Sequence, residues 1–496
     1  MADRAGRQRA SLGVAAAALL GLGIWAARAF LPDDEPPAPV PVIIYVVDTL
    51  RADRLGVYGS TQKLTPRFDA LAAESVLFEN AHAAGPWTLP SVASLMTSTW
   101  PCEHGVVRYG KMLSAEVPTL AGQLRGLGYR TGAFYNNYWV GGVAGVDRGF
   151  EVSTQKTDEE NDRATDAAAF LDGIAGAGTD ATPPFLLYLH TIEPHHPFNT
   201  PYNFIRQVRH VSPDAKETIR ALFYRFREIR TLDFAEGRPR GATDTSGEQT
   251  AIMAELTKLK PDVVTLYDAG VAHADANLGA VIDLLKARGL WDKALFIVLS
   301  DHGEEFGEHG GWFHDQSVYE ELMHVPLLVH FPAGAHAGRR VQSRVSLVDV
   351  MPAVLDYLGQ APLCANCRGR SFLPLLEDDA PAAGAGATGV NGMRLNDDVW
   401  YAPLKAARGD VNVAIRRDRL KGIWNPEPGT LELYDLDADP AERVDLSASD
   451  PGTARELRDE AVSWLEQCQA GTRGATEIDA PDERTRQQLR SLGYFN

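Results

Sequence analysis

Three unbroken apolar runs stand out along the sequence. They span residues 42–47 (VIIYVV), 185–190 (FLLYLH) and 294–300 (ALFIVLS), and a strand buried on both faces has this composition. Before the third run, apolar residues recur with helical spacing at Val264, Tyr267, Val271, Leu278, Ile282 and Leu285. Strands that alternate with helices predict an α/β fold, with a mostly parallel sheet sandwiched by helices.

The rest of the chain divides where its composition changes. Residues 203–247 are charged and partly helical, and we interpret them as an insertion or lid; residues 380–389, rich in Ala and Gly, predict a flexible loop. Strand-like segments then lie within residues 411–436, and an amphipathic helix is predicted over 454–468. We therefore predict a large domain over 42–375 and a smaller C-terminal α+β subdomain over 376–496.

The N-terminus has the order of an export signal. Arg4, Arg7 and Arg9 precede an uncharged run over residues 10–27, and an acidic, Pro-rich stretch follows. This order predicts a signal peptide or N-terminal membrane anchor over residues 1–31 and a linker over 32–41. A buried core helix is disfavoured, because nothing amphipathic flanks the run. The chain is expected to be extracytoplasmic, in the periplasm or cell envelope, with cleavage or membrane anchoring left open.

The net charge of −18 excludes a general nucleic-acid partner, since such binding needs a basic face. An anionic substrate would need local positive charge, from a metal ion or from helix N-termini.

The chain has four cysteines, too few for a disulfide framework. Cys364 and Cys367 have C-x-x-C spacing, but no second pair completes a zinc site. We predict a local disulfide between these two cysteines.

Reactive side chains follow each of the three apolar runs. Asp48 comes directly after the first, His190 ends the second, and Asp301 and His302 follow the third. Ligands of open parallel sheets bind just beyond the carboxyl ends of the strands, where these residues would converge. Each aspartate alone would suit a loop or a helix cap. Together they predict a site for one divalent metal ion: Mn, Zn, Mg or Ca.

A helix is predicted just after Thr88, because Pro90 stands near the start of an apolar periodic run. Thr88 would lie at or beside its N-cap. One interpretation is a simple cap, worth about 1 kcal/mol of stability. The other is a hydroxyl that faces an anion at the helix N-terminus, where a neighbouring metal ion would make it a nucleophile.

Several motifs resemble, in order, those of the sulfatase family of the alkaline phosphatase superfamily. Residues 47–59 (VDTLRADRLGVYG) resemble its opening motif, 300–310 (SDHGEEFGEHG) its second metal-binding motif, and 193–198 (EPHHPF) its D-P-H-x-P-Y loop. Further matches are Pro101 with His104-Gly105-Val106, Val348-Asp349-Val350-Met351-Pro352, and Leu433-Tyr434-Asp435-Leu436 with Asp439-Pro440. The resemblance covers residue 42 to the C-terminus and implies an alkaline-phosphatase-like fold.

The resemblance also implies roles for individual residues. Asp48, Asp301 and His302 would bind the metal ion, with Thr49 as a candidate fourth ligand, and Thr88 falls at the nucleophile position. The remaining candidates are His195 and His309 as catalytic residues, and Asn137 and His314 as substrate-binding residues. The histidines would contact the oxyanion or protonate the leaving group. For His190, His196 and His273, a packing or supporting role is an equally good interpretation.

The chain departs from the family pattern at the nucleophile. Sulfatases have Cys or Ser in a C/S-x-P-x-R motif, which matures to formylglycine, whereas this chain has Thr88 and, in place of the Arg, Val92. No formylglycine is therefore expected. The lysine of the family's G-K-W region is also absent, since residues 128–131 lead into Asn136 and Asn137. An unmodified Thr instead resembles the superfamily's phosphodiesterases and phosphoalcohol transferases of the cell envelope.

Three functions follow from this pattern. The first is a metal-dependent hydrolase or transferase that uses Thr88 on phosphate esters. The second is a sulfatase proper that cleaves sulfate esters by an unmodified route. The third is a non-catalytic binding protein with the same fold, which intact metal ligands beside a hydroxyl argue against. The substrate is an anionic ester in the first two, and phosphate and sulfate are too similar in shape for the sequence to separate them.

Overall fold

The computed structural model describes residues 39–107, 110–157, 161–175, 183–235, 246–314, 317–377, 399–403, 411–426, 429–471 and 474–477. Residues 41–496 form one compact unit. The predicted N-terminal signal or anchor and the loop at 380–389 lie outside the described residues. Within the described ranges, none of the helices combines the length and the apolar character that crossing a bilayer requires.

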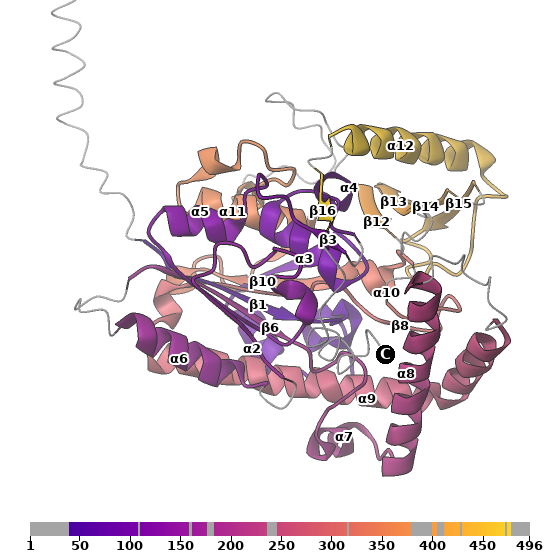
Figure 1. The fold of residues 1–496 in the computed structure, drawn as a ribbon, viewed down its shortest axis with the longest axis horizontal. Coiled ribbons are helices and arrows are strands. Elements are labelled where there is room, and N and C mark those ends of the chain that lie inside the picture. Colours follow the sequence, from indigo (N-terminus) through magenta and orange to yellow (C-terminus); the bar gives the residue numbers. More distant parts are fainter. Residues whose placement is uncertain are drawn as a thin grey trace, which may run out of the picture. The chain divides into compact units, whose positions relative to one another are not determined.

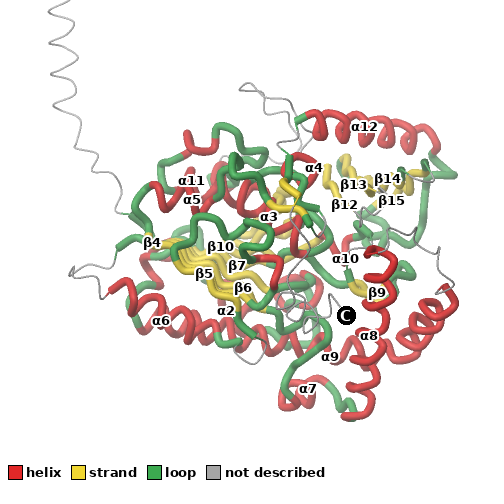
Figure 2. The backbone as a smooth tube through the Cα atoms, in the orientation of Figure 1, coloured by secondary structure: helices red, strands yellow, loops and turns green. Residues whose placement is uncertain are grey.

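An eight-stranded sheet forms the centre of this unit (Figures 1 and 2). Its order is β11-β2-β10-β7-β1-β6-β4-β5. The strands are β1 (Val42–Val47), β2 (Val76–His82), β4 (Arg130–Tyr135), β5 (Val152–Gln155), β6 (Phe185–Thr191), β7 (Leu295–Leu299), β10 (His324–His330) and β11 (Arg340–Ser346). Only β10 pairs antiparallel with its neighbours in this sheet, so the predicted mostly parallel sheet is confirmed.

The three predicted strands lie side by side. β1 is the middle one, with β6 on one side and β7 on the other, both parallel to it. Every residue of β1 is fully buried, as its unbroken apolar sequence requires. Because the strands are parallel neighbours, their carboxyl ends meet at one edge of the sheet.

Helices cover both faces of the sheet, which confirms the predicted sandwich (Figure 1). One layer holds α2 (Pro66–Ala73), α6 (Arg163–Ala175) and α9 (Ser246–Ala287); the other holds α3 (Thr88–Thr97), α5 (Leu120–Gly126) and α11 (Val350–Tyr357). Tyr267, Val271 and Leu278 of α9 are buried in the core, in agreement with the predicted apolar face. Shorter elements are β3 (Lys111–Met112), α4 (Pro101–His104), β8 (Glu305–Phe306), β9 (Trp312–Phe313), α10 (Glu320–Met323) and β16 (Thr476–Glu477).

The predicted C-terminal α+β subdomain is a second, antiparallel sheet with one long helix. The sheet consists of β12 (Val399–Pro403), β13 (Val411–Arg417), β14 (Leu420–Asn425) and β15 (Thr430–Asp435), and the helix is α12 (Pro451–Ala470). Leu433, Leu457 and Trp464 share one apolar core, which Trp100 of the large domain joins. The subdomain therefore packs on the segment that follows α3.

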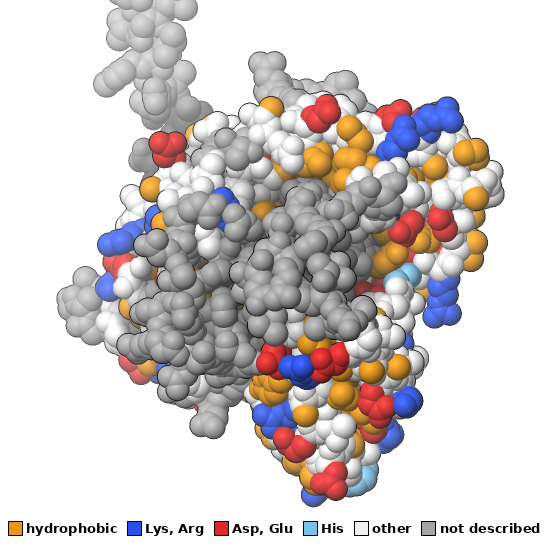
Figure 3. Space-filling model, turned by 45° about the vertical axis from the view of Figure 1, so that its right-hand side comes forward, with side chains coloured by type: hydrophobic (Ala, Val, Ile, Leu, Met, Phe, Trp, Pro, Cys, Tyr) orange, Lys and Arg blue, Asp and Glu red, His pale blue; other side chains and the backbone are white. Residues whose placement is uncertain are grey.

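The charged segment after β6 forms α7 (Tyr202–Val208) and α8 (Pro213–Ala235). Its apolar face is buried, with Phe223 at 0% exposure, and the Phe223 ring lies 3.9 Å from the His196 ring. On the face drawn in Figure 3, acidic and basic side chains are interspersed. Arg225 of α8 forms ion pairs with Glu228 and Glu248. The segment thus reaches the edge of the sheet where the predicted site lies.

Two disulfides are present. Cys364–Cys367 confirms the predicted local bond. Cys102 and Cys468 form a second bond, between α4 and α12, which could not be predicted from local spacing because 366 positions separate them.

This long-range disulfide should contribute far more stability than the local one. Closing a longer loop removes more conformational entropy from the unfolded chain, so the Cys102→Ala/Cys468→Ala variant should lose about 2–5 kcal/mol of unfolding free energy. Chemical denaturation measures this loss. The matched control is Cys364→Ala/Cys367→Ala, and equal losses in the two variants would contradict the entropic argument.

Candidate active site

Four neighbouring strands deliver polar side chains to one edge of the sheet. Asp48 follows β1, Asn137 follows β4, His190 is the next-to-last residue of β6, and Asp301 and His302 follow β7. All five side chains are buried. The parallel order β7-β1-β6-β4 explains the convergence, since every one of these strands ends at the same edge.

Asp48, Asp301 and His302 form a group whose ligand atoms all lie within 4.8 Å of one another. The His302 Nε2 lies 3.4 Å from Asp48 Oδ1 and 3.6 Å from Asp301 Oδ2. Neither of those oxygens has a hydrogen-bond partner among the described residues. Buried carboxylate oxygens without donors are costly unless a cation holds them, so this donor set fits a divalent metal ion.

The backbone holds the His302 ring in the orientation of a metal ligand. Its Nδ1 donates to the Gly303 carbonyl at 2.9 Å, which leaves the lone pair on Nε2, facing the two carboxylates. Ser300 Oγ donates to the His302 carbonyl at 2.7 Å, and Ser91 Oγ donates to the Asp301 carbonyl at 2.6 Å. Hydrogen bonds from outside the group therefore hold Asp301 and His302 in place.

The pKa values of the two carboxyl groups are shifted in opposite directions. Burial and the nearby Asp48 charge raise the pKa of Asp301 well above its ordinary range. Burial also disfavours ionisation of Asp48, but interactions with His195, His190 and His302 outweigh it and lower the pKa of Asp48. Two carboxylates this close cannot both ionise unless a positive charge joins them, as a metal ion would.

Thr88 lies beside this group, as the first residue of α3. The N-cap is Trp87, which forms no side-chain cap, so Thr88 is not the capping residue. Its Oγ1 lies 3.3 Å from His302 Nε2 and 3.5 Å from Asp48 Oδ2. The hydroxyl therefore lies between the helix N-terminus and the carboxylates, as the second of the two interpretations of Thr88 requires.

Asn137 connects the hydroxyl to the acidic pair. Its Nδ2 donates to Thr88 Oγ1 at 3.0 Å and to Asp48 Oδ2 at 2.7 Å. Its Oδ1 accepts from Trp139 N at 3.0 Å, which fixes the amide so that the donor faces Thr88. The predicted substrate-binding residue is thus a neighbour of the candidate nucleophile.

Thr49 has a strained backbone next to Asp48, with φ at 60°, where β-branched residues are rare. Its N–H points to Asp301 Oδ1 at 3.4 Å, and its Oγ1 donates to the Asp48 carbonyl at 2.7 Å. Tyr267 OH holds the turn by donating to the Thr49 carbonyl at 2.7 Å. Thr49 therefore shapes the site with its backbone, and its role as a fourth ligand stays a prediction.

His190 is a member of the group that the sequence left undecided. Its Nε2 lies 3.3 Å from Asp48 Oδ2, and its Nδ1 lies 2.8 Å from Tyr188 OH. The sequence signal for a site role was the position of His190 at the end of an apolar strand. Histidines that only pack in the core can occupy the same position, so this signal did not decide between the two roles. His273, by contrast, stacks on Phe204 at 4.6 Å, in agreement with a packing role.

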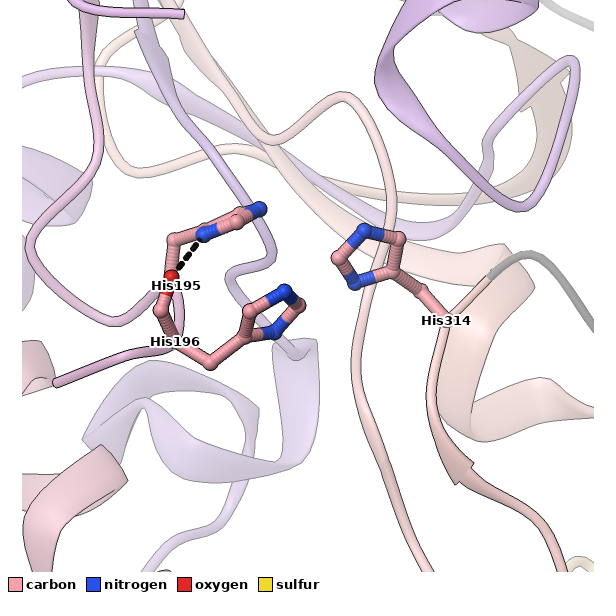
Figure 4. A group of neighbouring side chains, drawn as sticks. All are labelled: His195, His196 and His314. Carbon is pink, nitrogen blue, oxygen red and sulfur yellow. Dashed lines mark hydrogen bonds between the residues drawn. The ribbon is translucent and has the colours of Figure 1, made fainter. Parts of the chain in front are cut away.

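A second group of imidazoles, His195, His196 and His314, lies next to the first, with ligand atoms within 4.8 Å of one another. The rings of His302 and His314 are 4.6 Å apart. Figure 4 shows the three rings turned toward a common centre, His195 and His196 from the loop after β6 and His314 from the loop after β9. Burial lowers the pKa of His195 to about 4 and that of His196 well below its ordinary value.

His309 lies in a different group. Its ring stacks on Tyr319 at 3.6 Å, and its Nε2 lies 3.3 Å from Glu321 Oε1. Glu442 completes this third group. The structure thus brings His195 and His314 to the edge of the sheet but groups His309 with acidic residues, and its catalytic role stays a prediction.

Two family models match the chain. The model described as Sulfatase matches residues 41–360, and the model described as N-sulphoglucosamine sulphohydrolase, C-terminal, matches residues 307–469. The first match covers more than half of the chain and includes Asp48, Thr88, Asp301 and His302.

Known relatives cover both sulfur and phosphorus chemistry. The chain is 30% identical to Arylsulfatase K of Gallus gallus over 325 residues, 62% of this chain and 55% of that protein. The chain thus matches little more than half of that relative's length. It is 27% identical over 510 residues to the multifunctional alkaline phosphatase superfamily protein PehA of Trinickia caryophylli, with 85% of this chain and 94% of that protein covered.

A solved structure confirms the fold. The phosphonate monoester hydrolase of Agrobacterium radiobacter superposes with a TM-score of 0.61 at 22% identity, over 89% of this chain and all of that one (100%). The predicted alkaline-phosphatase-like architecture is therefore correct.

Proposed function

The chain belongs to the sulfatase family within the alkaline phosphatase superfamily, as a sulfatase-like hydrolase, and we propose that it cleaves phosphate esters, or transfers their phosphoryl group, with Thr88 as the nucleophile. A divalent metal ion held by Asp48, Asp301 and His302 is part of the proposal. The observation that carries it is the Thr88 hydroxyl, 3.3 Å from the His302 Nε2 that faces two unpartnered carboxylate oxygens.

The ion, when bound, would lower the pKa of the Thr88 hydroxyl and neutralise charge on a substrate oxygen. The chain itself supplies the other requirements. Asn137 donates to Thr88 Oγ1 and would continue to do so as negative charge develops there. The N-terminus of α3 offers backbone N–H groups to a non-bridging oxygen of the substrate.

The proposed reaction has two steps. The Thr88 hydroxyl gives up its proton as Oγ1 attacks phosphorus, a new O–P bond forms, the bond to the leaving oxygen breaks, and that oxygen takes up one proton to leave as an alcohol. Water or an acceptor alcohol then attacks the same phosphorus, which breaks the Thr88 O–P bond and restores the hydroxyl. Splitting one difficult displacement into two is the usual benefit of a covalent nucleophile.

A sulfate ester is the second candidate substrate, favoured by the arylsulfatases among the relatives. Sulfate monoesters carry one negative charge fewer than phosphate monoesters, so they gain less from a concentrated positive site. Metal-reconstituted full-length protein should be assayed against matched aryl sulfate, phosphate monoester and phosphodiester substrates. We expect a phosphate ester to react fastest. Faster turnover of the aryl sulfate than of every phosphate ester would overturn the substrate assignment and leave the fold unaffected.

The Asn137→Ala variant tests the donor to the nucleophile. Losing one preorganised donor to a developing oxyanion should lower kcat by about 10²-fold. The metal content should stay that of the wild type, because Asn137 is not among the proposed ligands. Asn137→Ser, which retains a shorter donor, is the matched control and should lose less. A kcat within threefold of wild type in Asn137→Ala, about 0.6 kcal/mol, would remove this residue from the proposal.

We also propose that the chain works outside the cytoplasm. Two features support this location: the basic, apolar and polar order of the first residues, and the two disulfides. Disulfides persist in oxidising compartments. A reporter fused after Pro41 that stays cytoplasmic would contradict it.

A further inference from the structure

We propose that His195, His196 and His314 form a second metal site, suited to Zn²⁺, beside the Asp48–Asp301–His302 group. The inference goes beyond the proposed function, because nothing in it depends on which ester the chain cleaves. Each of the three side chains offers one imidazole nitrogen, and these nitrogens lie within 4.8 Å of one another. Three imidazole nitrogens are the donor set of a tri-histidine zinc site, which keeps one coordination position open.

Hydrogen bonds fix the tautomer of each ring. The Nδ1 of His196 and that of His314 lie 3.2 and 2.9 Å from the two oxygens of one carboxylate, Glu304. The Nδ1 of His195 lies against the His196 backbone carbonyl. A carboxylate and a carbonyl only accept, so each Nδ1 is the donor, and the lone pair of each neutral ring is on Nε2.

These lone pairs need a cation. The Nε2 atoms of His195 and His196 are buried and have no hydrogen-bond partner among the described residues. Buried acceptors left without a donor are destabilising, and native structures rarely contain them. A neutral Nε2 cannot donate to a substrate oxyanion, whereas it can bind a metal ion. The lone pairs therefore favour a metal ion over direct contact with the anion.

Glu304 supplies the outer support that metal-binding histidines usually have. It is fully buried, and its carboxylate bridges two of the three rings, which fixes their orientation and raises their basicity. Phe223 and Phe313 pack against His196 with ring centroids 3.9 and 5.0 Å away. The site is thus held by a carboxylate on one side and aromatic rings on another.

The third group of candidate ligands, His309, Glu321 and Glu442, does not offer the same donor set. Glu442 Oε1 lies 2.8 Å from Lys421 Nζ, so a lysine already neutralises it. Its histidine, His309, provides the control variant for the experiment.

Zinc stoichiometry tests the proposal without reference to activity. Metal-free full-length protein is dialysed against Zn²⁺ and analysed by elemental analysis, with circular dichroism to verify folding. The wild type should bind two ions per chain, and Asp48→Asn/Asp301→Asn should keep one. Adding His196→Gln and His314→Gln to that variant should remove the remaining ion, whereas adding His309→Gln should not.

The Glu304→Gln variant tests the outer support. It should bind the second ion 10- to 100-fold more weakly, about the usual effect of losing an outer-shell carboxylate. One ion in the wild type, or none in folded Asp48→Asn/Asp301→Asn, would overturn the second site. Neither outcome would alter the roles proposed for Thr88, so failure of this inference and failure of the proposed function can be told apart.

Discussion

Replacing Thr88 with alanine is expected to lower kcat by roughly three orders of magnitude or more, because removal of a covalent nucleophile usually has that effect. The hydroxyl oxygen lies 3.3 Å from His302 Nε2, 3.5 Å from Asp48 Oδ2 and 3.0 Å from Asn137 Nδ2. Alanine removes it and fits without a clash. Steady-state kinetics with the best phosphate ester, at saturating metal, measures the loss.

The control for Thr88 is serine, which keeps the hydroxyl and loses only a methyl group. Thr88→Ser should retain part of the activity. Equal metal content in the wild type, Thr88→Ala and Thr88→Ser would verify that the ligands are intact. Turnover by Thr88→Ala at a near wild-type rate would show that the nucleophile is another group.

The second large effect is expected from the Asp48→Asn/Asp301→Asn variant, which should lose the ion of this site and activity with it. Both carboxylates contribute an oxygen without a hydrogen-bond partner among the described residues, and asparagine removes the charge while conserving shape. The same change removes the repulsion between two buried carboxylates. The metal-free variant should therefore be at least as stable as the metal-free wild type, while the wild type should gain more stability than the variant when metal is added, because the variant lacks the ion of this site.

Thermal denaturation with and without the divalent ion measures this difference. Tyr188→Phe is a suitable control, since it removes a buried hydroxyl that contacts His190 and leaves the proposed metal ligands unchanged. An equal rise in Tm on metal addition in the wild type and the double variant would show that the ion binds elsewhere.

The sequence was sufficient to locate the edge of the sheet where the site lies. Buried strands have a recognisable apolar composition, and parallel neighbours end together, so Asp48, Asp301 and His302 could be placed near one another before any coordinates. Motif order then added Thr88 and His195. The placement of Asp48, Asp301 and His302 depended on backbone topology alone, which the apolar pattern determines well.

Side-chain direction and long-range pairing could not be predicted in the same way. His190 contacts Asp48 only because β6 pairs with β1 in the register Val46↔His190. Glu304 joins His196 and His314 across separate loops, and its motif position gives no sign of that contact. Cys102 and Cys468 meet because α12 packs next to α4, a docking that local patterns do not encode.

We propose that Thr88, unmodified, carries the phosphoryl group during turnover. The most direct measurement is mass spectrometry of the Thr88 peptide, from resting protein and from protein quenched in acid during reaction with an aryl phosphate. We predict an unmodified Thr88 at rest and a phosphoryl group on Thr88 after the quench, with no labelled peptide from Thr88→Ala. A phosphoryl group on a different residue, or a modified Thr88 at rest, would contradict the role proposed for Thr88.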